Sequence, residues 1–327
     1  MGERDFKLIA RTAGFAVVGL MVGLAGVGTT AGFLGRLNPF FELLSNFRLQ
    51  YLVLGAIAAL LLLLFQSRRL ALAAGVLALV NLLYVAPFYL APPPPPDELA
   101  TQHYRALLLN VHFKNQAFEE VIHLVESTQP DLIIFLEATP EWVTALEPLR
   151  ADYPFVESGG LQPHPGSIAL FSRIEPEAVD IQDFGVPERP VIVAELKLDG
   201  QPLTVIGMHP YPFMAGAVFT AGKRLKQLEG LTEFLQRRTG PVMVLADFNF
   251  TPFSPLYHDL LRETGLRDTS RGFGLQPTFP AYYPPLYVPI DYGMVSPEIA
   301  VLGHTVGPPV GSDHLPVIVD FAISTQD

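Results

Sequence analysis

The stretch GSDHLPVIVD, Gly311–Asp320, places an acid and an imidazole directly before an apolar strand. Asp313 and His314 stand side by side, and the run after them has the aliphatic and β-branched residues of a buried strand. Two interpretations are open at this point. A polar turn before the last strand would explain the pair, and so would a catalytic pair mounted on a rigid element.

Polar residues of the same kind stand at the ends of five other apolar runs. These runs are RALLLNV, DLIIFLE, LTVIGMH, PVMVLADFN and PIDYGMVS, and their polar residues are Asn110, Glu137, His209, Asp247 with Asn249, and Asp291. Each of these residues by itself is typical of a turn. Six strand ends with this composition instead indicate side chains aimed into one shared cleft, which favours the catalytic interpretation.

The order of the apolar runs predicts the fold class. Further strands are expected at SIALFS, VIVAELKL and LPVIVDF, and the apolar spacing within 117–125 and 228–235 indicates helices. Strands outnumber helices and do not alternate strictly with them. The pattern therefore predicts an α/β protein, a layered sandwich of two mixed β-sheets flanked by helices, preceded by a helical membrane region.

Three uncharged apolar stretches precede the predicted sandwich, at Phe15–Leu34, Tyr51–Phe65 and Leu70–Leu90. A membrane-spanning helix needs about 20 apolar residues, and the second stretch reaches this length only with its flanking residues. A cleaved signal peptide would explain the first stretch alone. We therefore expect a membrane region with three transmembrane helices (1–91), a proline-rich linker containing APPPPP (92–103) and a catalytic domain (104–327).

Charge is distributed unequally along the chain. Residues 1–99 hold seven Lys/Arg and five Asp/Glu, which leaves 14 basic and 27 acidic residues, a formal charge of −13, for the remainder. Such an acidic domain disfavours tight binding to nucleic acid, which needs a basic surface. Basic residues near the N-terminus and between the second and third stretches indicate the cytoplasmic ends, so an integral membrane protein with its catalytic domain on the non-cytoplasmic side is expected. The absence of cysteine excludes disulfides and thiolate metal sites.

The motifs LLLNV, DLIIFLEAT, GMHPYP, VLADFN, IDYGMVS and GSDHLP resemble, in order and approximate spacing, those of the endonuclease/exonuclease/phosphatase superfamily. DFN together with SDH is the specific part of this resemblance, which leaves out the membrane region. It implies a hydrolase acting on phosphoester bonds, of the phosphodiesterase or nuclease class, that uses Mg²⁺ or Mn²⁺.

The resemblance also implies a metal site and a histidine–aspartate pair. Glu137, aided by Asn110 and Asp313, resembles the set that holds the metal ion, and hard cations do prefer oxygen ligands. His314 resembles the imidazole that binds phosphate or activates water, with Asp291 as its orienting partner.

Three further residues receive roles from the same resemblance. Asp247 resembles the residue that positions or deprotonates the attacking water, and Asn249 resembles a donor to a phosphate oxygen. His209 matches a position that stabilises charge or protonates the leaving group. Apart from the resemblance, Lys223 and Arg224 start the predicted helix after HPYPF, and Arg224 is a candidate contact for the substrate phosphate. A solvated helix start is the alternative interpretation of both residues.

One position departs from the family pattern. Several members carry a further acidic metal ligand after the first asparagine, whereas this sequence has Val111, His112 and Phe113 there. This departure favours one metal ion over two. His112 could reach the cleft, but a loop histidine is the preferred interpretation.

The preferred function is a membrane-anchored, metal-dependent phosphoesterase that hydrolyses a phosphodiester or phosphomonoester by metal- and His/Asp-assisted attack of water. A lipid headgroup or small phosphoester is the favoured substrate, the lipid bilayer is an expected partner, and the apolar loop AYYPPLYVP (Ala281–Pro289) would suit a lipid. A nuclease acting on DNA is one alternative, disfavoured by the acidic charge. A non-catalytic membrane scaffold is the other, disfavoured because all six polar strand ends are present. The sequence does not indicate an oligomeric state.

Overall fold

The computed structural model describes residues 3–90, 102–160, 165–212 and 217–323. Most of the predicted linker, including its five prolines, lies outside these residues. The chain forms two compact units, Met1–Pro87 with Phe253–Pro255 and Phe88–Pro252 with Leu256–Asp327.

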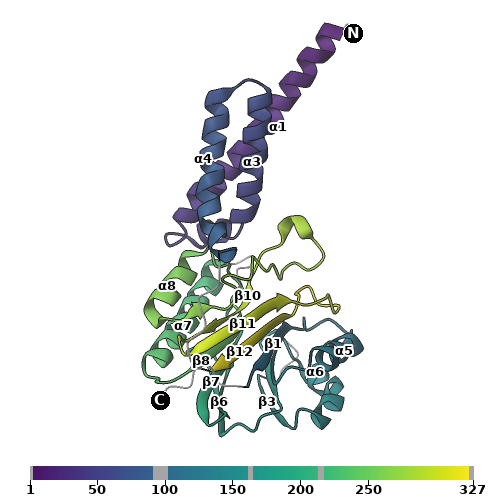
Figure 1. Ribbon diagram of the computed structural model, residues 1–327, viewed down its shortest axis with the longest axis vertical. Coiled ribbons are helices and arrows are strands. Elements are labelled where there is room, and N and C mark those ends of the chain that lie inside the picture. Colours follow the sequence, from purple (N-terminus) through teal and green to yellow (C-terminus); the bar gives the residue numbers. More distant parts are fainter. Residues whose placement is uncertain (1–2, 91–101, 161–164, 213–216, 324–327) are drawn as a thin grey trace. The chain divides into compact units, whose positions relative to one another are not determined.

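The first unit consists mainly of helices, drawn in purple and blue in Figure 1. They are α1 (Glu3–Phe33), α2 (Pro39–Ser45), α3 (Arg48–Leu64) and α4 (Arg68–Val85), and the turn η1 (Ala86–Phe88) follows. Two segments, Arg11–Phe33 and Arg68–Phe88, are long and apolar enough to cross a membrane. A third span is obtained only if α2 and α3, which are bent by 62° at their break, form one span. The first and third predicted spans are thus supported by length and composition, and the second only in this bent form.

This helical unit has apolar side chains on its outside and polar side chains between its helices. Leucines such as Leu60 and Leu72 are 59% and 71% exposed on the outside. Arg48 and Asn81 are buried between the helices, where Arg48 Nη1 donates to Asn81 Oδ1 (3.3 Å) and Asn81 Nδ2 donates to Thr29 Oγ1 (2.8 Å). Polar groups that satisfy one another inside, with apolar groups outside, are expected of helices surrounded by hydrocarbon.

The first sheet of the second unit has six strands in the order β11-β12-β1-β2-β4-β3. It is mixed, because β1 pairs parallel with β2 and antiparallel with β12. The parallel pair is connected through α5, which packs with α6 on the outer face. The bounds are β1 (Tyr104–Asn110), α5 (Phe118–Thr128), β2 (Leu132–Leu136), α6 (Pro140–Ala145), η2 (Glu147–Ala151), β3 (Phe155–Gly159), β4 (Ile168–Ser172), β11 (Ile299–Val306) and β12 (Val317–Ile323).

The second sheet also has six strands, in the order β5-β6-β7-β8-β10-β9. It is also a mixed sheet. The parallel strands β7 and β8 are connected by the helix α7, and β10 is antiparallel to β8. The bounds are β5 (Ala178–Gln182), β6 (Val191–Leu198), β7 (Gln201–Met208), α7 (Ala217–Gln236), β8 (Val242–Asp247), α8 (Pro255–Thr264), β9 (Arg267–Asp268), η3 (Pro284–Leu286) and β10 (Asp291–Val295).

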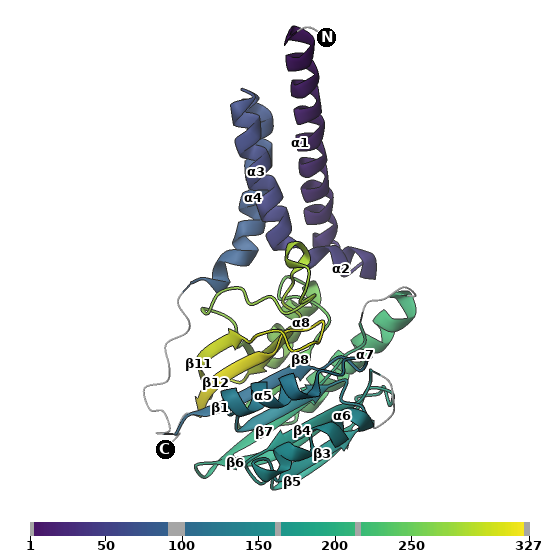
Figure 2. The same ribbon diagram turned by 90° about the vertical axis from the view of Figure 1, so that its right-hand side faces the viewer.

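The two sheets face each other across an apolar core to which both contribute, including Leu108 and Ile134 from the first sheet and Leu245 from the second. The sheets approach closely at Gly207, where a Cβ would lie 2.8 Å from the Ile134 side chain. Helices α7 and α8 cover one outer face, and α5 and α6 cover the other (Figures 1 and 2). The predicted fold class, two mixed sheets flanked by helices, is confirmed.

The eight strands expected from the sequence are present. Four others were not expected, namely β3, β5, β9 and β11. Strand β5 is mostly exposed and β3 is partly exposed, so neither carries the apolar run that marks a buried strand. In β11 the pairing register shifts between Val301 and Gly303, and such an irregularity interrupts the alternation of residues that a sequence pattern detects.

Candidate active site

Strand direction brings the six polar positions to one edge of the sandwich. Asn110 ends β1 and Glu137 follows β2, and these parallel strands place both residues at the same edge. In the other sheet the parallel strands β7 and β8 place His209 beside Asp247 in the same way. Asp291 begins the antiparallel strand β10 directly opposite Asp247.

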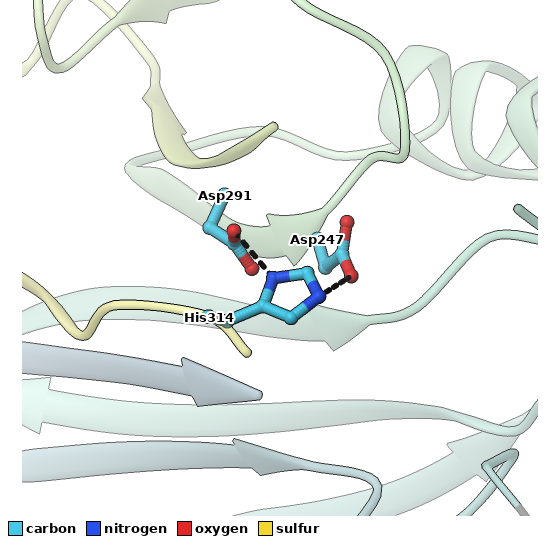
Figure 3. A group of neighbouring side chains, drawn as sticks. All are labelled: Asp247, Asp291 and His314. Atoms are coloured by element: carbon cyan, nitrogen blue, oxygen red, sulfur yellow. Dashed lines mark hydrogen bonds and ion pairs between the residues drawn. The ribbon is translucent and has the colours of Figure 1, made fainter. Parts of the chain in front are cut away.

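His314 lies between two carboxylates at this edge (Figure 3). Its Nδ1 is 2.8 Å from Asp291 Oδ2, and its Nε2 is 3.8 Å from Asp247 Oδ2. All three side chains are buried, and the Phe279 ring lies over the imidazole with 4.7 Å between ring centroids. Burial by itself lowers the pKa of His314, but the charges of Asp291 and Asp247 outweigh it and raise the pKa to about 10. The imidazole is therefore protonated at neutral pH.

Asp247 contacts several other residues of the site. Its Oδ2 lies 3.3 Å from His209 Nε2 and accepts a hydrogen bond from Asn110 Nδ2 (3.2 Å), while Oδ1 accepts one from the Asn249 backbone N–H (3.0 Å). Burial alone raises the pKa of Asp247, but His314 and His209 lower it to about 2. A carboxylate with so low a pKa stays ionised and is a weak base, so it orients a water molecule better than it deprotonates one.

A second group, Glu137, Asn110, His112 and Asp313, lies at the same edge. Glu137 Oε2 accepts a hydrogen bond from the Phe113 backbone N–H (3.0 Å), and its Oε1 accepts one from Asn110 Nδ2 (3.3 Å). His112 Nδ1 lies 3.7 Å from Glu137 Oε2 and 3.4 Å from Asp313 Oδ1. Sequence reasoning treated His112 as an ordinary loop histidine, and the structure places it between these two carboxylates.

The residues predicted as metal ligands fit a hard divalent cation in their chemistry. Glu137 and Asp313 supply carboxylate oxygens, and Asp313 Oδ1 is a buried atom that accepts no hydrogen bond among the described residues. Asn110 presents its amide nitrogen to Glu137, while its oxygen accepts from the His112 N–H (3.0 Å). Asn110 would therefore need to turn its amide to act as a ligand.

The trio Asp247, Asp291 and His314 could also hold a cation by distance, because one ligand atom from each lies within 4.8 Å of the others. The protonation of His314 argues against this assignment. An imidazolium has no free nitrogen lone pair, and its Nδ1–H already donates to Asp291. The trio is better suited to hydrogen bonding with a phosphate and a water molecule.

Three of the seven non-glycine residues with positive φ in the described part of the chain lie at this edge. His112, Glu137 and Asn249 have φ values of 57°, 58° and 56°, in the left-handed region that side chains other than glycine rarely adopt. Such strain persists where the surrounding contacts enforce it, and it clusters at functional sites. The turn at Asn249 directs its Nδ2 to the Pro210 carbonyl (3.1 Å), beside His209.

Two arginines lie on the second sheet's side of the site. Arg189 is buried, and its Nη1 contacts His209 Nδ1 at 2.8 Å. The sequence analysis did not identify Arg189 as a site residue. Arg224 is also buried and donates from Nη1 to the Asn249 carbonyl (3.2 Å). The helix that carries Arg224 begins at Ala217, so the sequence interpretation placed its start too late.

The paired sheets and the acid–histidine edge define a class of hydrolases that cleave phosphoester bonds. The chain belongs to the Endonuclease/Exonuclease/phosphatase family, whose sequence profile matches residues 63–314. It is accordingly a hydrolase acting on phosphoester bonds. No curated protein sequence matches the chain significantly.

Solved structures show the same fold at low sequence identity. An endonuclease/exonuclease/phosphatase from Bacteroides vulgatus superposes with a TM-score of 0.58 at 16% identity, covering 68% of this chain and 100% of that one. D. rerio TDP2 complexed with a single-strand DNA product gives 0.57 at 14% identity, with 67% and 99% covered. A functionally unknown conserved protein from Enterococcus faecalis gives 0.56 at 17% identity, with 67% and 100% covered.

Proposed function

We propose that this chain is a membrane-anchored, metal-dependent phosphoesterase whose substrate is a lipid headgroup or another small phosphoester. The observation that carries the proposal is the placement of Asp247 between two histidines, at the same edge as the Glu137 group. In this proposal residues 1–91 anchor the chain, 92–103 form a linker and 104–327 form the catalytic domain. The catalytic domain lies on the non-cytoplasmic side of the membrane.

Glu137 and Asp313, with Asn110 after rotation of its amide, are the residues that would hold Mg²⁺ or Mn²⁺. The bound ion would polarise a phosphoryl oxygen and offset the charge that develops there. The buried Asp313 Oδ1, which accepts no hydrogen bond among the described residues and lies 3.4 Å from His112 Nδ1, supports this assignment together with the oxygen chemistry of the group.

The other catalytic roles are assigned to side chains of the protein itself. His314, kept protonated by Asp291, donates a hydrogen bond to a phosphoryl oxygen and stabilises its negative charge. Asp247 accepts a hydrogen bond from the attacking water and aligns it with phosphorus. Asn249 donates to a second phosphoryl oxygen, and Arg224 contributes positive charge from the neighbouring helix.

The test is a substrate comparison with the full-length chain in detergent micelles. Substrates are bis(p-nitrophenyl) phosphate, phospholipids in mixed micelles and plasmid DNA, each with Mg²⁺ and with a chelator. Metal-dependent hydrolysis of the first two, reduced by roughly 10²–10⁴-fold in His314→Gln, is the expected result. The matched control is His123→Gln, which changes an exposed histidine on α5.

The same comparison separates the alternatives. Preferential nicking of plasmid DNA that requires His314 would support a nuclease, and the DNA product in the structure of D. rerio TDP2 gives that alternative a structural precedent. No hydrolysis of any substrate by a folded chain would favour the non-catalytic scaffold. Hydrolysis that the chelator leaves unchanged would refute the metal-dependent proposal.

A further inference from the structure

Arg189 is a buried arginine whose guanidinium is fixed from two sides. The residue lies just before β6 and is 5% exposed. Its Nη1 donates to the Pro165 carbonyl at 2.8 Å, and its guanidinium lies over the Tyr211 ring, 4.9 Å from the centroid. The same Nη1 contacts His209 Nδ1 at 2.8 Å. The orientation of Arg189 is therefore set by groups other than His209.

This contact determines where His209 carries its proton. A guanidinium has only N–H donors and stays charged in proteins, so the atom facing it must accept. His209 Nδ1 must then present its lone pair, and a neutral ring carries its single proton on Nε2. Nε2 is the atom that lies 3.3 Å from Asp247 Oδ2, so the proton points at the catalytic carboxylate.

The same geometry opposes protonation of both ring nitrogens. A proton on Nδ1 would face an Arg189 N–H across 2.8 Å, with two positive charges in contact. Two positive charges at that distance repel strongly at a buried site, where little solvent screens them. Asp247 attracts positive charge at the opposite nitrogen, and the Nε2–H of a neutral ring already donates a hydrogen bond to this carboxylate.

The two histidines that flank Asp247 thus have opposite partners. The Nδ1 of His314 faces the carboxylate of Asp291 at 2.8 Å, which favours an imidazolium, whereas the Nδ1 of His209 faces a cation at the same distance. Both rings direct Nε2 at Asp247 Oδ2. Their functions are therefore expected to differ although both are histidines at one carboxylate.

We propose that Arg189 is a positioning residue that holds His209 as the neutral Nε2–H tautomer, so that the single N–H of His209 points at Asp247 and is shared with a phosphoryl oxygen when substrate binds. In this state His209 is not the acid that protonates the leaving group. The part concerning phosphate rests on the proposed function, whereas the tautomer is a property of the chain without substrate. Of the two roles that the family resemblance allows for His209, the geometry selects stabilisation of charge.

The test reads the tautomer directly. The full-length chain is prepared in micelles with ¹⁵N-labelled histidine, and long-range ¹H–¹⁵N correlations distinguish protonated from unprotonated ring nitrogens. His209→Gln assigns the signals. The expected result at neutral pH is one protonated nitrogen in His209, namely Nε2. A doubly protonated ring, or a proton on Nδ1, in the unmodified chain would overturn the proposal.

Two substitutions of Arg189 add a functional readout. Arg189→Lys keeps a donor-only cation and is expected to retain the Nε2–H tautomer and much of kcat. Arg189→Met removes the donor and is expected to release the tautomer and lower kcat by roughly 10–10²-fold, with a smaller change in KM. If Arg189→Met folds and leaves the His209 tautomer fixed, Arg189 does not position the ring. An absence of hydrolysis in the unmodified chain would refute the proposed function and leave the spectroscopic result standing.

Discussion

Replacing Asp291 with asparagine should make the activity strongly dependent on pH. The carboxylate accepts the His314 Nδ1–H at 2.8 Å, and an asparagine oxygen accepts the same hydrogen bond without the charge. The substitution therefore preserves the position of the imidazole while removing the nearest negative charge that stabilises its protonated form. Because His314 is proposed to act as an imidazolium, the loss should appear as a shift of the pH profile.

The magnitude follows from the distance. At an effective dielectric constant of about 20, unit charges 2.8 Å apart interact by about 6 kcal/mol, which corresponds to a change of about 4 in the pKa. The pKa of His314, about 10 in the unmodified protein, should then fall to about 6 in Asp291→Asn. At about pH 8 only about 1% of the imidazole stays protonated, so kcat should be roughly 10²-fold lower, and it should recover as the pH approaches 6.

The assay is hydrolysis of bis(p-nitrophenyl) phosphate across the pH range for both proteins. The matched control is Asp268→Asn, which replaces another buried carboxylate of the same sheet, one that accepts a hydrogen bond from the Tyr257 hydroxyl (2.9 Å). A constant loss of activity at every pH, or the same profile in the control, would refute the assignment of charge to His314.

Stability gives an independent check of the same charge. The folded pKa of His314, about 10, lies above its ordinary value of 6.5. Its contribution to the free energy of unfolding is therefore complete below about pH 6.5 and is lost as the pH rises toward 10. Urea unfolding should show this alkaline loss in the unmodified chain and much less of it in Asp291→Asn.

Four further predictions concern the metal site, acid stability, core packing and topology. Glu137→Gln should abolish most of the rise in Tm that saturating Mg²⁺ or Mn²⁺ produces in the unmodified chain, and an equal rise in both would remove Glu137 from the metal site. Burial lowers the pKa of His304 to about 4, so between pH 6.5 and 4 the unfolded chain binds a proton that the folded chain does not. The free energy of unfolding should therefore fall by about 3 kcal/mol on acidification through this range. His304→Gln should remove that part of the acid dependence in urea unfolding. Gly207→Ala places a Cβ 2.8 Å from the Ile134 side chain and should cost about 1–3 kcal/mol, part of which Ile134→Val restores in the double variant, whereas additive losses would contradict the contact. The chain has no cysteine, so His123→Cys should be labelled by a membrane-impermeant maleimide on intact cells, and labelling only after lysis would reverse the proposed orientation.

The buried strands could be predicted because their apolar runs have a single physical cause. A central strand covered on both faces, such as β1 or β8, needs apolar side chains at nearly every position, and the sequence shows this directly. Edge strands carry no such requirement. The exposed β5 lies at the edge of its sheet and pairs with β6, and backbone pairing of that kind leaves little trace in the residue types.

The site residues likewise divide into those that the sequence predicts and those that it does not. Residues at the ends of predicted strands could be named because strand direction alone brings them to one edge. Arg189 and His112 lie in segments between strands, and their contacts depend on loop conformation, including the left-handed backbone at His112. A usable signal did exist for Arg189, because an arginine directly before a buried strand must have its charge satisfied by nearby groups.

The balance of charge at the site gives a reason for its proposed dependence on a divalent cation. Four carboxylates meet at one edge of the sandwich, whereas three positive charges, on His314, Arg189 and Arg224, contact the catalytic groups among the described residues. The carboxylates are Glu137, Asp247, Asp291 and Asp313. A phosphoester anion that approaches this excess of negative charge is repelled, and a divalent cation held by Glu137 and Asp313 would cancel the excess. A small phosphoester needs only this local compensation, whereas a long polyanion needs basic residues along its whole path, which a domain with a formal charge of −13 is poorly composed to provide.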